Sequence, residues 1–442
     1  MGSNPIIITA NDCSPFENQK GYGEAIQYFI SQKEMLNVFH IGEIKKQDDL
    51  EIAYFSYKDA QWYAGRLIGE ATFDFEGVTY KIIIKPRFGN VQLFRMLEEV
   101  FNVRLTNSKN TIQKNNEFQF LIKKLIAFLW LNLLSKANKH GIPRQSINKT
   151  YKGTTVRGRI DVRRSILPLR TEDKLVSQYR EKEADNAIAT ILKKAYHILN
   201  AEYNLPQVKT TQNARNAIQQ IVSTKTSTKY FTELDYHNIK YKEIYKSFKP
   251  VVDLSWDIVK KKSFGNVDDS KNSGMSFFLD MAEIWEIYLR SILKKRLAKN
   301  GWKLKNEKIK TYKHKDFART LIPDIVLEKD DSVMVWDAKY KRMKYKYFDY
   351  DRADFFQIHT YINYYQQNKN VIAGGLLYPL SEQFTQEKQG KNKANSLFSE
   401  NTTPTQFLVD GIDYSEFDEN TITNIENDFL DRIASIEINH PL

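Results

Sequence analysis

Two short apolar strands are predicted between Leu321 and Tyr340, the first of them over Leu321–Leu327. Side chains alternate between the faces of a strand, so Asp337 and Lys339 share one face, about 7 Å apart. If the first strand pairs with the second, Asp324 joins Asp337. Paired carboxylates supply the oxygen ligands that Mg²⁺ prefers, and the lysine lies where an attacking water would be. The segment therefore suggests a metal-dependent nuclease.

A simpler interpretation of the same residues is structural. Asp337 and Lys339 would then be an exposed ion pair on an edge strand, and Pro323 and Asp324 a turn that enters the first strand. Short motifs match by chance, so the neighbouring segments have to decide between the two interpretations.

A helix is predicted upstream over Met275–Leu297, where apolar residues recur at three- and four-residue spacing. Glu286 lies at the margin of this apolar stripe, from which its carboxylate could reach the metal. The alternative is an ion pair with Arg290 one turn later, which contributes roughly 0.3–0.5 kcal/mol to helix stability. The sequence leaves both roles open.

A second helix is predicted downstream over Asp351–Gln366. Gln357 and Tyr361 fall one turn apart on one face of it, where they could clamp DNA near the metal or form a surface pair beside the apolar core stripe. His359 on this helix is interpreted as incidental. Val371–Leu377 follows as a strand of the buried type.

This order of motifs resembles the PD-(D/E)xK nuclease superfamily in its RecB-type variety. The chain as a whole resembles the McrC family, the nuclease subunits of McrBC-type modification-dependent restriction systems, which act against phage. Three further segments fit that family: K-I-I-I-K-P-R-F-G-N from Lys81, G-R-I-D-V-R-R from Gly158 and A-D-N-A-I-A from Ala184. The residues that the resemblance implies for catalysis are Asp324, Asp337, Lys339, Glu286, Gln357 and Tyr361.

The resemblance also implies a role for each of these residues. Asp324 and Asp337, helped by Glu286, would hold Mg²⁺, with Mn²⁺ as an alternative ion, and Lys339 would activate the water. Gln357 and Tyr361 would support them. Glu283, one turn before Glu286, competes for the position of the helix carboxylate.

The resemblance implies DNA and a McrB-like AAA+ GTPase oligomer as partners. That GTPase would recognise modified DNA and translocate it, while the N-terminal part of this chain docks on it and stimulates hydrolysis. The sequence contains no nucleotide-binding motif of its own: the glycine-spaced segment from Gly153 has Arg159 and Ile160 where a phosphate-binding loop needs Lys and Ser or Thr. Four arginines are eligible for the stimulating role: Arg157, Arg159, Arg163 and Arg164.

The charge distribution fits DNA binding. The net charge is +12, but the residues from Glu400 onward carry ten acids and one base, so the preceding part carries +21. Ten Lys or Arg residues and one acid lie between Lys294 and Lys315, and a second basic run begins at Lys341. Such runs are commonly only a solvated face. Because these two flank the proposed metal site, we interpret them as a surface that follows phosphates.

Length and composition predict a multidomain α+β protein. The chain has 442 residues, 41% of them hydrophobic, which suffices for two or three cores. Its one cysteine, Cys13, excludes an internal disulfide framework and a Cys-rich zinc site, which fits the cytoplasm. The most apolar run, Leu125–Leu134, is too short for a membrane span, and the N-terminus does not read as a signal peptide.

Three domains are predicted. Residues 1–105 form a strand-rich N-terminal domain for partner docking, 106–265 a mainly helical middle region, and 274–442 a C-terminal α/β PD-(D/E)xK endonuclease domain after a linker at Ser263–Ser273. The aromatic stretch Thr224–Lys249 is interpreted as helix packing, with a nucleic-acid stacking surface as the alternative. The predicted N-terminal strands and hairpin arms are Glu51–Ser56, Trp62–Ile68, Ala71–Phe75 and Val78–Ile84, followed by a helix over Val91–Val100. The predicted middle helices are Phe118–Leu134, Asn186–Leu199 and Ala214–Val222, interrupted by a strand over Thr154–Val162.

The motifs predict Mg²⁺-dependent phosphodiester hydrolysis, and the resemblance implies that it takes place within a restriction system. Two alternatives stay open: a self-sufficient RecB-like repair nuclease, and a non-catalytic subunit that assembles and activates the GTPase. Neither the modified base nor the stoichiometry of the complex follows from the sequence.

Overall fold

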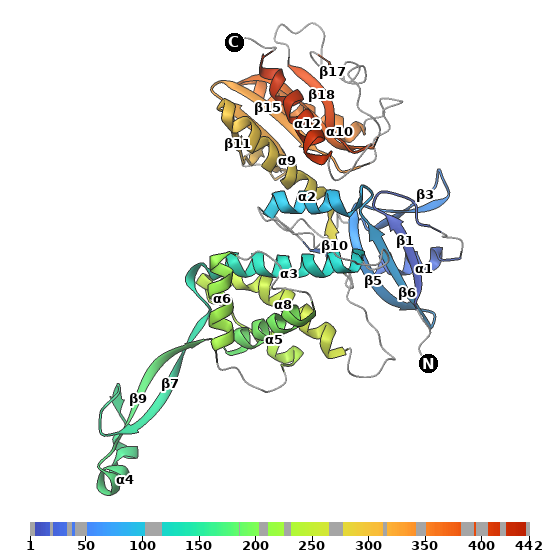
Figure 1. Ribbon diagram of the computed structural model, residues 1–442. Coiled ribbons are helices and arrows are strands. Elements are labelled where there is room, and N and C mark those ends of the chain that lie inside the picture. The colour runs from blue at the N-terminus through green and yellow to red at the C-terminus, as the bar shows by residue number, and fades with distance from the viewer. Residues whose placement is uncertain are drawn as a thin grey trace. The chain divides into compact units, whose positions relative to one another are not determined.

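The chain forms two compact units in the computed structural model, one made of residues 1–104 and 272–442 and the other of residues 105–271. Figure 1 shows the elements of both units. The structure describes residues 5–17, 21–32, 38–39, 51–101, 117–184, 186–202, 211–224, 231–264, 277–312, 316–341, 351–381, 393–394, 405–415 and 421–438. Several helices and sheets alternate along the chain, as predicted for a mixed α+β protein.

The N-terminal part of the first unit is built on a five-stranded sheet with the order β1-β6-β5-β10-β2, beside the separate hairpin β3-β4. The hairpin predicted at Glu76-Gly77 is confirmed: both residues have positive φ, 49° and 76°, as the tight turn between twisted strands requires. The elements of this part are β1 (Ile6–Asn11), α1 (Gly23–Ser31), β2 (Val38–Phe39), β3 (Ala53–Ser56), β4 (Gln61–Ala64), β5 (Leu67–Phe75), β6 (Val78–Lys85), α2 (Gly89–Phe101) and β10 (Phe277–Asp280).

Two of the sequence predictions in this part were wrong. The strand predicted over Trp62–Ile68 divides into β4 and β5 because the chain crosses another segment at Gly65, where a Cβ atom would lie 1.9 Å from the carbonyl oxygen of Glu51. The helix predicted from Met275 begins only at Met281: the all-apolar Phe277–Leu279 pairs with β5, and the Asp280 side chain caps the helix by accepting from Ala282 N at 2.9 Å.

The C-terminal part of the first unit is a six-stranded sheet with the order β11-β14-β15-β16-β18-β17. Helix α10 packs on the face that carries Val333 and Val335, and α9 and α12 cover the opposite face. The elements are α9 (Met281–Leu297), the 3-10 turn Ala298–Asn300, β11 (Lys303–Lys305), β12 (Ile309–Thr311), β13 (Arg319–Leu321), β14 (Ile325–Lys329), β15 (Ser332–Ala338), α10 (Arg352–Gln366), β16 (Asn370–Leu380), β17 (Lys393–Ala394), β18 (Gln406–Asp413) and α12 (Ile422–Ile438).

The predicted helix over Asp351–Gln366 and the predicted strand over Val371–Leu377 are confirmed as α10 and β16. The strand predicted over Leu321–Leu327 divides into β13 and β14. Pro323 lies at the break, where its lack of an N–H group prevents a continuous ladder.

The second unit is mainly helical, as predicted, but it also carries a long arm that the sequence did not predict, built on the three-stranded sheet β7-β9-β8 (Figure 1). Strands β7 and β9 pair over ten residues, and α4 lies at the end of the arm. Of the strand predicted over Thr154–Val162 only Arg159–Ile160 forms, as β8. The elements are α3 (Glu117–Ala137), the 3-10 turn Asn138–His140, β7 (Arg144–Gly153), β8 (Arg159–Ile160), α4 (Val162–Glu172), β9 (Leu175–Ala184), α5 (Asn186–Glu202), α6 (Gln212–Ser223), α7 (Glu233–His237), the 3-10 helix Glu243–Phe248 and α8 (Lys249–Phe264).

The aromatic residues after Thr224 pack within this unit where the structure describes them. Phe248 is fully buried, and the Tyr236 ring stacks on Trp256 with their centroids 5.2 Å apart. The predicted helix packing is therefore confirmed for these two residues. Most of the predicted linker, like the boundary at residue 105, lies outside the described residues.

Candidate active site

Asp324 lies between β13 and β14, directly before the strand that pairs with β15. Ile325 is opposite Trp336 in that antiparallel pair, so the preceding residue falls beside the end of β15. The Asp324 Oδ2 atom accepts a hydrogen bond from Ala338 N at 2.9 Å. This bond fixes the carboxylate next to Asp337, as expected if the two predicted strands pair.

Asp337 and Lys339 lie on one face at the end of β15, as the strand alternation predicts. Asp337 is 1% exposed, and its Oδ2 atom lies 2.6 Å from Lys339 Nζ. The backbone of Lys339 is also held, because its N–H donates to Leu377 O at 2.9 Å and prolongs the pairing with β16. The interpretation as an exposed pair on an edge strand is wrong, since β15 lies between β14 and β16.

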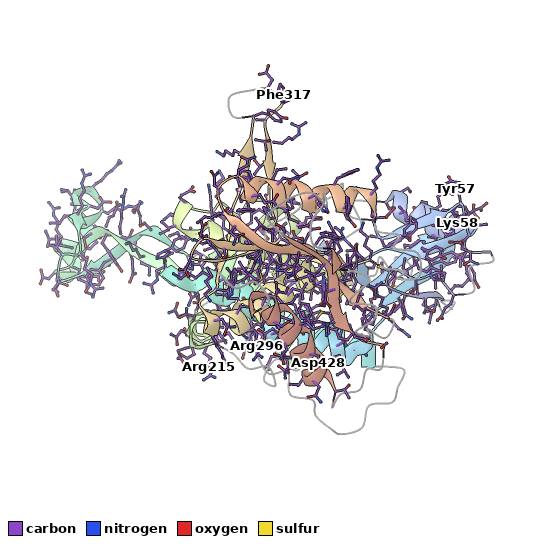
Figure 2. All side chains as sticks on the ribbon, turned by 90° about the horizontal axis from the view of Figure 1, so that it is seen from above. Tyr57, Lys58, Arg215, Arg296, Phe317 and Asp428 are labelled. Atoms are coloured by element: carbon purple, nitrogen blue, oxygen red, sulfur yellow. The ribbon has the colours of Figure 1, made fainter. Side chains whose placement is uncertain are left out.

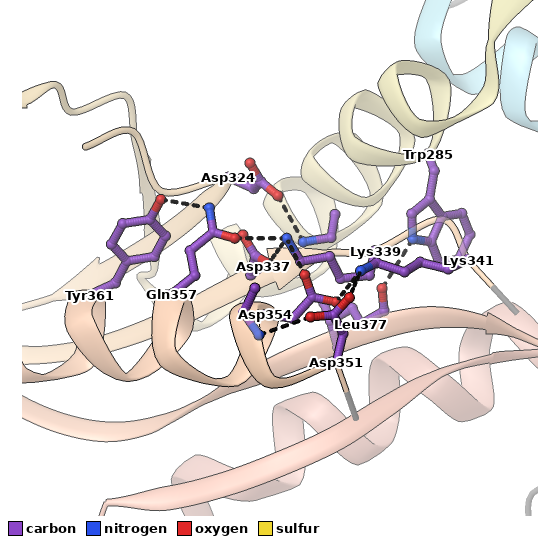
Figure 3. Close-up of polar contacts among 12 residues, drawn as sticks. Trp285, Asp324, Asp337, Lys339, Lys341, Asp351, Asp354, Gln357, Tyr361 and Leu377 are labelled. Atoms are coloured by element: carbon purple, nitrogen blue, oxygen red, sulfur yellow. Dashed lines mark hydrogen bonds and ion pairs between the residues drawn. The ribbon is translucent and has the colours of Figure 1, made fainter. Parts of the chain in front are cut away.

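Helix α10 brings Gln357 and Tyr361 to the same place (Figure 3). Lys339 Nζ donates to Gln357 Oε1 at 2.9 Å, and Gln357 Nε2 donates to the Tyr361 hydroxyl at 3.0 Å. The helix is oriented by Asp351, whose carboxylate caps it by accepting from Ala353 N at 2.8 Å. Residues predicted from separate segments thus form one hydrogen-bonded chain from Tyr361 to Asp337.

Asp354 and Lys341 also belong to this network, although the sequence analysis did not place them in the site. Lys339 Nζ lies 3.4 Å from one Asp354 oxygen, and Lys341 Nζ lies 2.6 Å from the other. Lys341 also contacts Asp351 at 3.0 Å. The spacing in the sequence could have indicated both residues, because Asp354 precedes Gln357 by one helical turn and Lys341 follows Lys339 by two residues, the period of a strand.

Burial and neighbouring charges act in opposite directions on the pKa values of Asp337 and Lys339. Burial raises the pKa of Asp337, and the adjacent Lys339 ammonium opposes that rise. For Lys339, burial favours the neutral amine, but the carboxylates of Asp337 and Asp354 outweigh it and raise the pKa above its usual value. Burial raises the pKa of Tyr361, so its hydroxyl stays protonated at neutral pH. Lys339 therefore carries a positive charge next to the carboxylates.

The two carboxylates fit a divalent cation. Both Asp337 oxygens are buried: Oδ2 forms the ion pair with Lys339 Nζ, and Oδ1 accepts no hydrogen bond from the described part of the chain. Mg²⁺ is commonly held by one or two carboxylates, with water and substrate phosphate completing its octahedron. Among the described residues no group of three His, Cys, Asp or Glu side chains is arranged to hold a metal.

Helix α9 approaches the site from the other face of the sheet. Trp285 Nε1 donates to Leu377 O at 3.1 Å, and the Arg290 guanidinium donates to the Asp324 carbonyl oxygen and to Asn306. Glu286 lies between these two anchors and is half-buried, whereas Glu283 is buried. The role of Glu286 as a metal ligand stays a prediction.

A buried cluster in the N-terminal part holds the segment that follows Lys339. The Asp12 Oδ1 atom accepts from Arg87 N at 2.5 Å, and its Oδ2 atom lies 3.7 Å from the Arg87 side chain. The Arg87 guanidinium lies over the Tyr340 ring, 4.7 Å from its centroid, and donates to Lys341 O at 3.4 Å. Arg87 belongs to the K-P-R-F-G-N segment, but its contacts could not be predicted from the sequence and are known only from the structure.

Some basic side chains of the first basic run, Lys294–Lys315, form ion pairs within the protein. Lys295 and Arg296 form ion pairs with Glu99 and Asp431, and Lys305 pairs with Glu328 at 3.1 Å. Five members of the two runs lie outside the described part: Lys313, Lys315, Arg342, Lys344 and Lys346. Part of the predicted phosphate-binding charge is therefore neutralised within the protein.

Comparison with known proteins decides the family. A family model described as the McrBC 5-methylcytosine restriction system component matches residues 65–379. The chain belongs to this family. The predicted resemblance to McrC is thereby confirmed at the family level. No curated protein matches the chain.

Two solved structures from Thermococcus gammatolerans are similar to this McrBC family member. One is a refined half-complex from a tetradecameric assembly of McrB AAA+ hexamers with bound McrC, with 15% identity and a TM-score of 0.50, covering 97% of this chain and 100% of that chain. At this identity the likeness shows a shared fold. The other is a cryo-EM structure of the McrBC complex, with 12% identity and a TM-score of 0.33, covering 66% of this chain and 88% of that chain. None of the described helices is long and apolar enough to span a membrane.

Proposed function

We propose that this chain is the nuclease subunit of a McrBC-type restriction system and that it hydrolyses DNA phosphodiester bonds. The observation that carries the proposal is the convergence of Asp324, Asp337 and Lys339 at the end of β15, with Lys339 Nζ 2.6 Å from Asp337. A structural ion pair on a surface would not need a second carboxylate fixed beside it. We assign the nuclease centre to the PD-(D/E)xK type on the same grounds.

Asp324 and Asp337 would hold Mg²⁺, or Mn²⁺ in its place, with Glu286 assisting from α9. A bound ion of this kind neutralises charge on the phosphate and lowers the pKa of bound water. Lys339 stays charged beside these carboxylates and stabilises the negative charge that develops on the attacking oxygen and the phosphate. Gln357 holds the lysine ammonium in place, and Tyr361 orients the Gln357 amide.

We further propose a McrB-like AAA+ GTPase as the partner, by analogy with the Thermococcus complex, whose AAA+ hexamers carry bound McrC. Docking is assigned to residues 1–105, as predicted. The eligible arginines lie on the arm of the second unit: Arg159 is exposed on β8, and Arg163 and Arg164 are exposed on α4. Their exposure leaves them available to a partner.

The decisive assay is plasmid cleavage by the purified chain with Mg²⁺, in which partner, GTP and DNA methylation are varied independently. We expect cleavage of methylated plasmid that depends on both partner and GTP. Cutting without the partner would favour a self-sufficient repair nuclease. Stimulated GTP hydrolysis without any cutting would favour a non-catalytic activator and contradict the proposal.

A further inference from the structure

A two-stranded ribbon lies immediately before the candidate active site. Strands β12 and β13 pair antiparallel, with Ile309 opposite Leu321 and Thr311 opposite Arg319, and they form a sheet of their own. Figure 2 shows the ribbon projecting from the C-terminal part, with Phe317 near its end. Only Ile322 and Pro323 separate β13 from Asp324.

The base of the ribbon is anchored in the core that supports the active site. Ile309 is 5% exposed and packs in the same cluster as Val326 and Tyr361, and Leu321 packs against that cluster. Just before β12, Glu307 accepts a hydrogen bond from the Tyr365 hydroxyl at 2.6 Å. The ribbon is therefore fixed at the end next to Asp324.

Its outer end exposes two aromatic rings. Tyr312 is 65% exposed and Phe317 57%, and their ring centroids lie 5.0 Å apart in an edge-to-face arrangement. Tyr312 adopts a left-handed backbone conformation with φ 48°, which is uncommon for an aromatic residue. A two-stranded ribbon gains no core from rings held in water, and adjoining exposed aromatics mark interaction surfaces.

The ribbon also presents unneutralised positive charge. Lys310 and Arg319 are exposed, and no acidic side chain in the described part of the chain pairs with either. Asp316 is the acidic residue among the described positions of the ribbon. By contrast, Lys295 and Lys305 of the same basic run form ion pairs with acidic side chains. Basic flanks around an aromatic end fit double-stranded DNA, whose major groove presents base edges and thymine methyl groups between two rows of phosphates.

We propose that this ribbon enters the major groove of the DNA duplex that is held for cutting, with Lys310 and Arg319 on phosphates and Tyr312 and Phe317 against the bases. The major groove is about 12 Å wide and admits a two-stranded ribbon. Because the ribbon ends three residues before Asp324, contact in the groove fixes the distance from the duplex to the carboxylates. The proposal rests on the proposed nuclease function and adds the element that positions its substrate.

The test measures binding of a fluorescein-labelled duplex by anisotropy over a salt titration, with and without the partner GTPase. The full-length chain carries Asp337→Ala throughout, so that no cleavage interferes. Replacing both Tyr312 and Phe317 by alanine should weaken binding by roughly 10-fold or more, because each ring loses its apolar contact with base edges and thymine methyl groups, without changing the salt slope. Replacing both Lys310 and Arg319 by alanine should reduce that slope by about two.

A matched control for the measurement without the partner GTPase is Tyr57→Ala, because Tyr57 is 91% exposed in the turn between β3 and β4, at another hairpin end (Figure 2). This variant should bind DNA like the parent. The proposal is overturned if the ribbon variants also bind like the parent, if the parent shows no salt-dependent binding, or if the aromatic variant loses only its association with the GTPase. Failure of the nuclease proposal is distinct: the chain with intact Asp337 would leave plasmid uncut although DNA binding depends on the ribbon.

Discussion

At the scale of single residues, Lys339 is assigned a catalytic role and Lys341 a supporting one. Lys339 contacts Asp337, whereas Lys341 contacts Asp351, and both contact Asp354. We predict that Lys339→Met lowers the cleavage rate by roughly 10²–10³-fold, the range for losing one positioned group that stabilises developing negative charge. Lys341→Met should reduce it much less. Equal losses in single-turnover plasmid cleavage would contradict this assignment.

Gln357 acts through Lys339, so its replacement should affect rate more than affinity. We predict that Gln357→Leu lowers kcat because the hydrogen bond to Lys339 Nζ is lost, while KM for DNA changes little. Tyr361→Phe retains the packing and loses only the hydroxyl that accepts from Gln357, so its effect should be smaller. If Gln357→Leu changes only KM, Gln357 instead clamps the DNA, which is the other role considered in the sequence analysis.

The sequence could predict this group of residues because local patterns place them. Strand alternation put Asp337 and Lys339 on one face, and helical spacing put Gln357 one turn from Tyr361. The contacts of Arg87 with Asp12 and Tyr340 involve segments far apart in the chain. No periodicity connects such segments, so that cluster required tertiary structure.

At the scale of elements, the sequence predicted the strands and helices whose apolar residues repeat regularly. It missed β7 and β9 because R-Q-S-I-N-K-T-Y-K-G is mostly polar and most side chains of the pair are exposed or only half-buried. It assigned Phe277–Leu279 to a helix because a short apolar run has no distinctive period. Neighbouring β5, to which that run pairs, lies two hundred residues earlier in the sequence.

The packing of α2, α9 and α12 depends on one buried carboxylate. Arg95 donates two hydrogen bonds to Glu426, at 2.8 and 2.7 Å, and the Tyr288 hydroxyl donates a third at 2.5 Å. We predict that Glu426→Leu destabilises the first unit by about 1.5–3 kcal/mol, because Arg95 loses its two hydrogen bonds to this carboxylate and keeps the longer ion pair with Glu99 at 3.9 Å. Chemical denaturation measures this, and a loss below about 1 kcal/mol would contradict the role given to the network.

Helix α8 should make the stability of the second unit depend on pH. Burial, reinforced by Asp253, raises the pKa of Asp257 to about 6. A carboxyl with a raised folded-state pKa binds its proton more tightly when folded, so its stabilising contribution is present at low pH and is lost as the pH rises from about 4 to about 6. Asp257→Asn should therefore stabilise the unit by about 1–3 kcal/mol at pH 8 and have little effect at pH 4. Denaturation at both pH values tests this, and equal effects would contradict it.

At the scale of the whole molecule, one chain combines a candidate nuclease centre with an exposed arm and contains no recognised nucleotide-binding motif. Membership of the McrBC family is consistent with a division of labour between this chain and a GTPase. With Mg²⁺ and GTP present, Asp324→Ala should therefore stop cleavage while leaving the assembly with the GTPase intact, which size-exclusion chromatography can check. Loss of assembly in this variant would assign Asp324 a structural role.

The measurement that tests the central claim most directly is methylated-plasmid cleavage by the Asp337→Ala variant with Mg²⁺, the partner GTPase and GTP. GTP hydrolysis in the same reaction is the control for assembly. The account predicts that cleavage is abolished while stimulation of GTP hydrolysis is unchanged. Cleavage at the rate of the unsubstituted protein would show that the phosphodiester bond is not cut at Asp337.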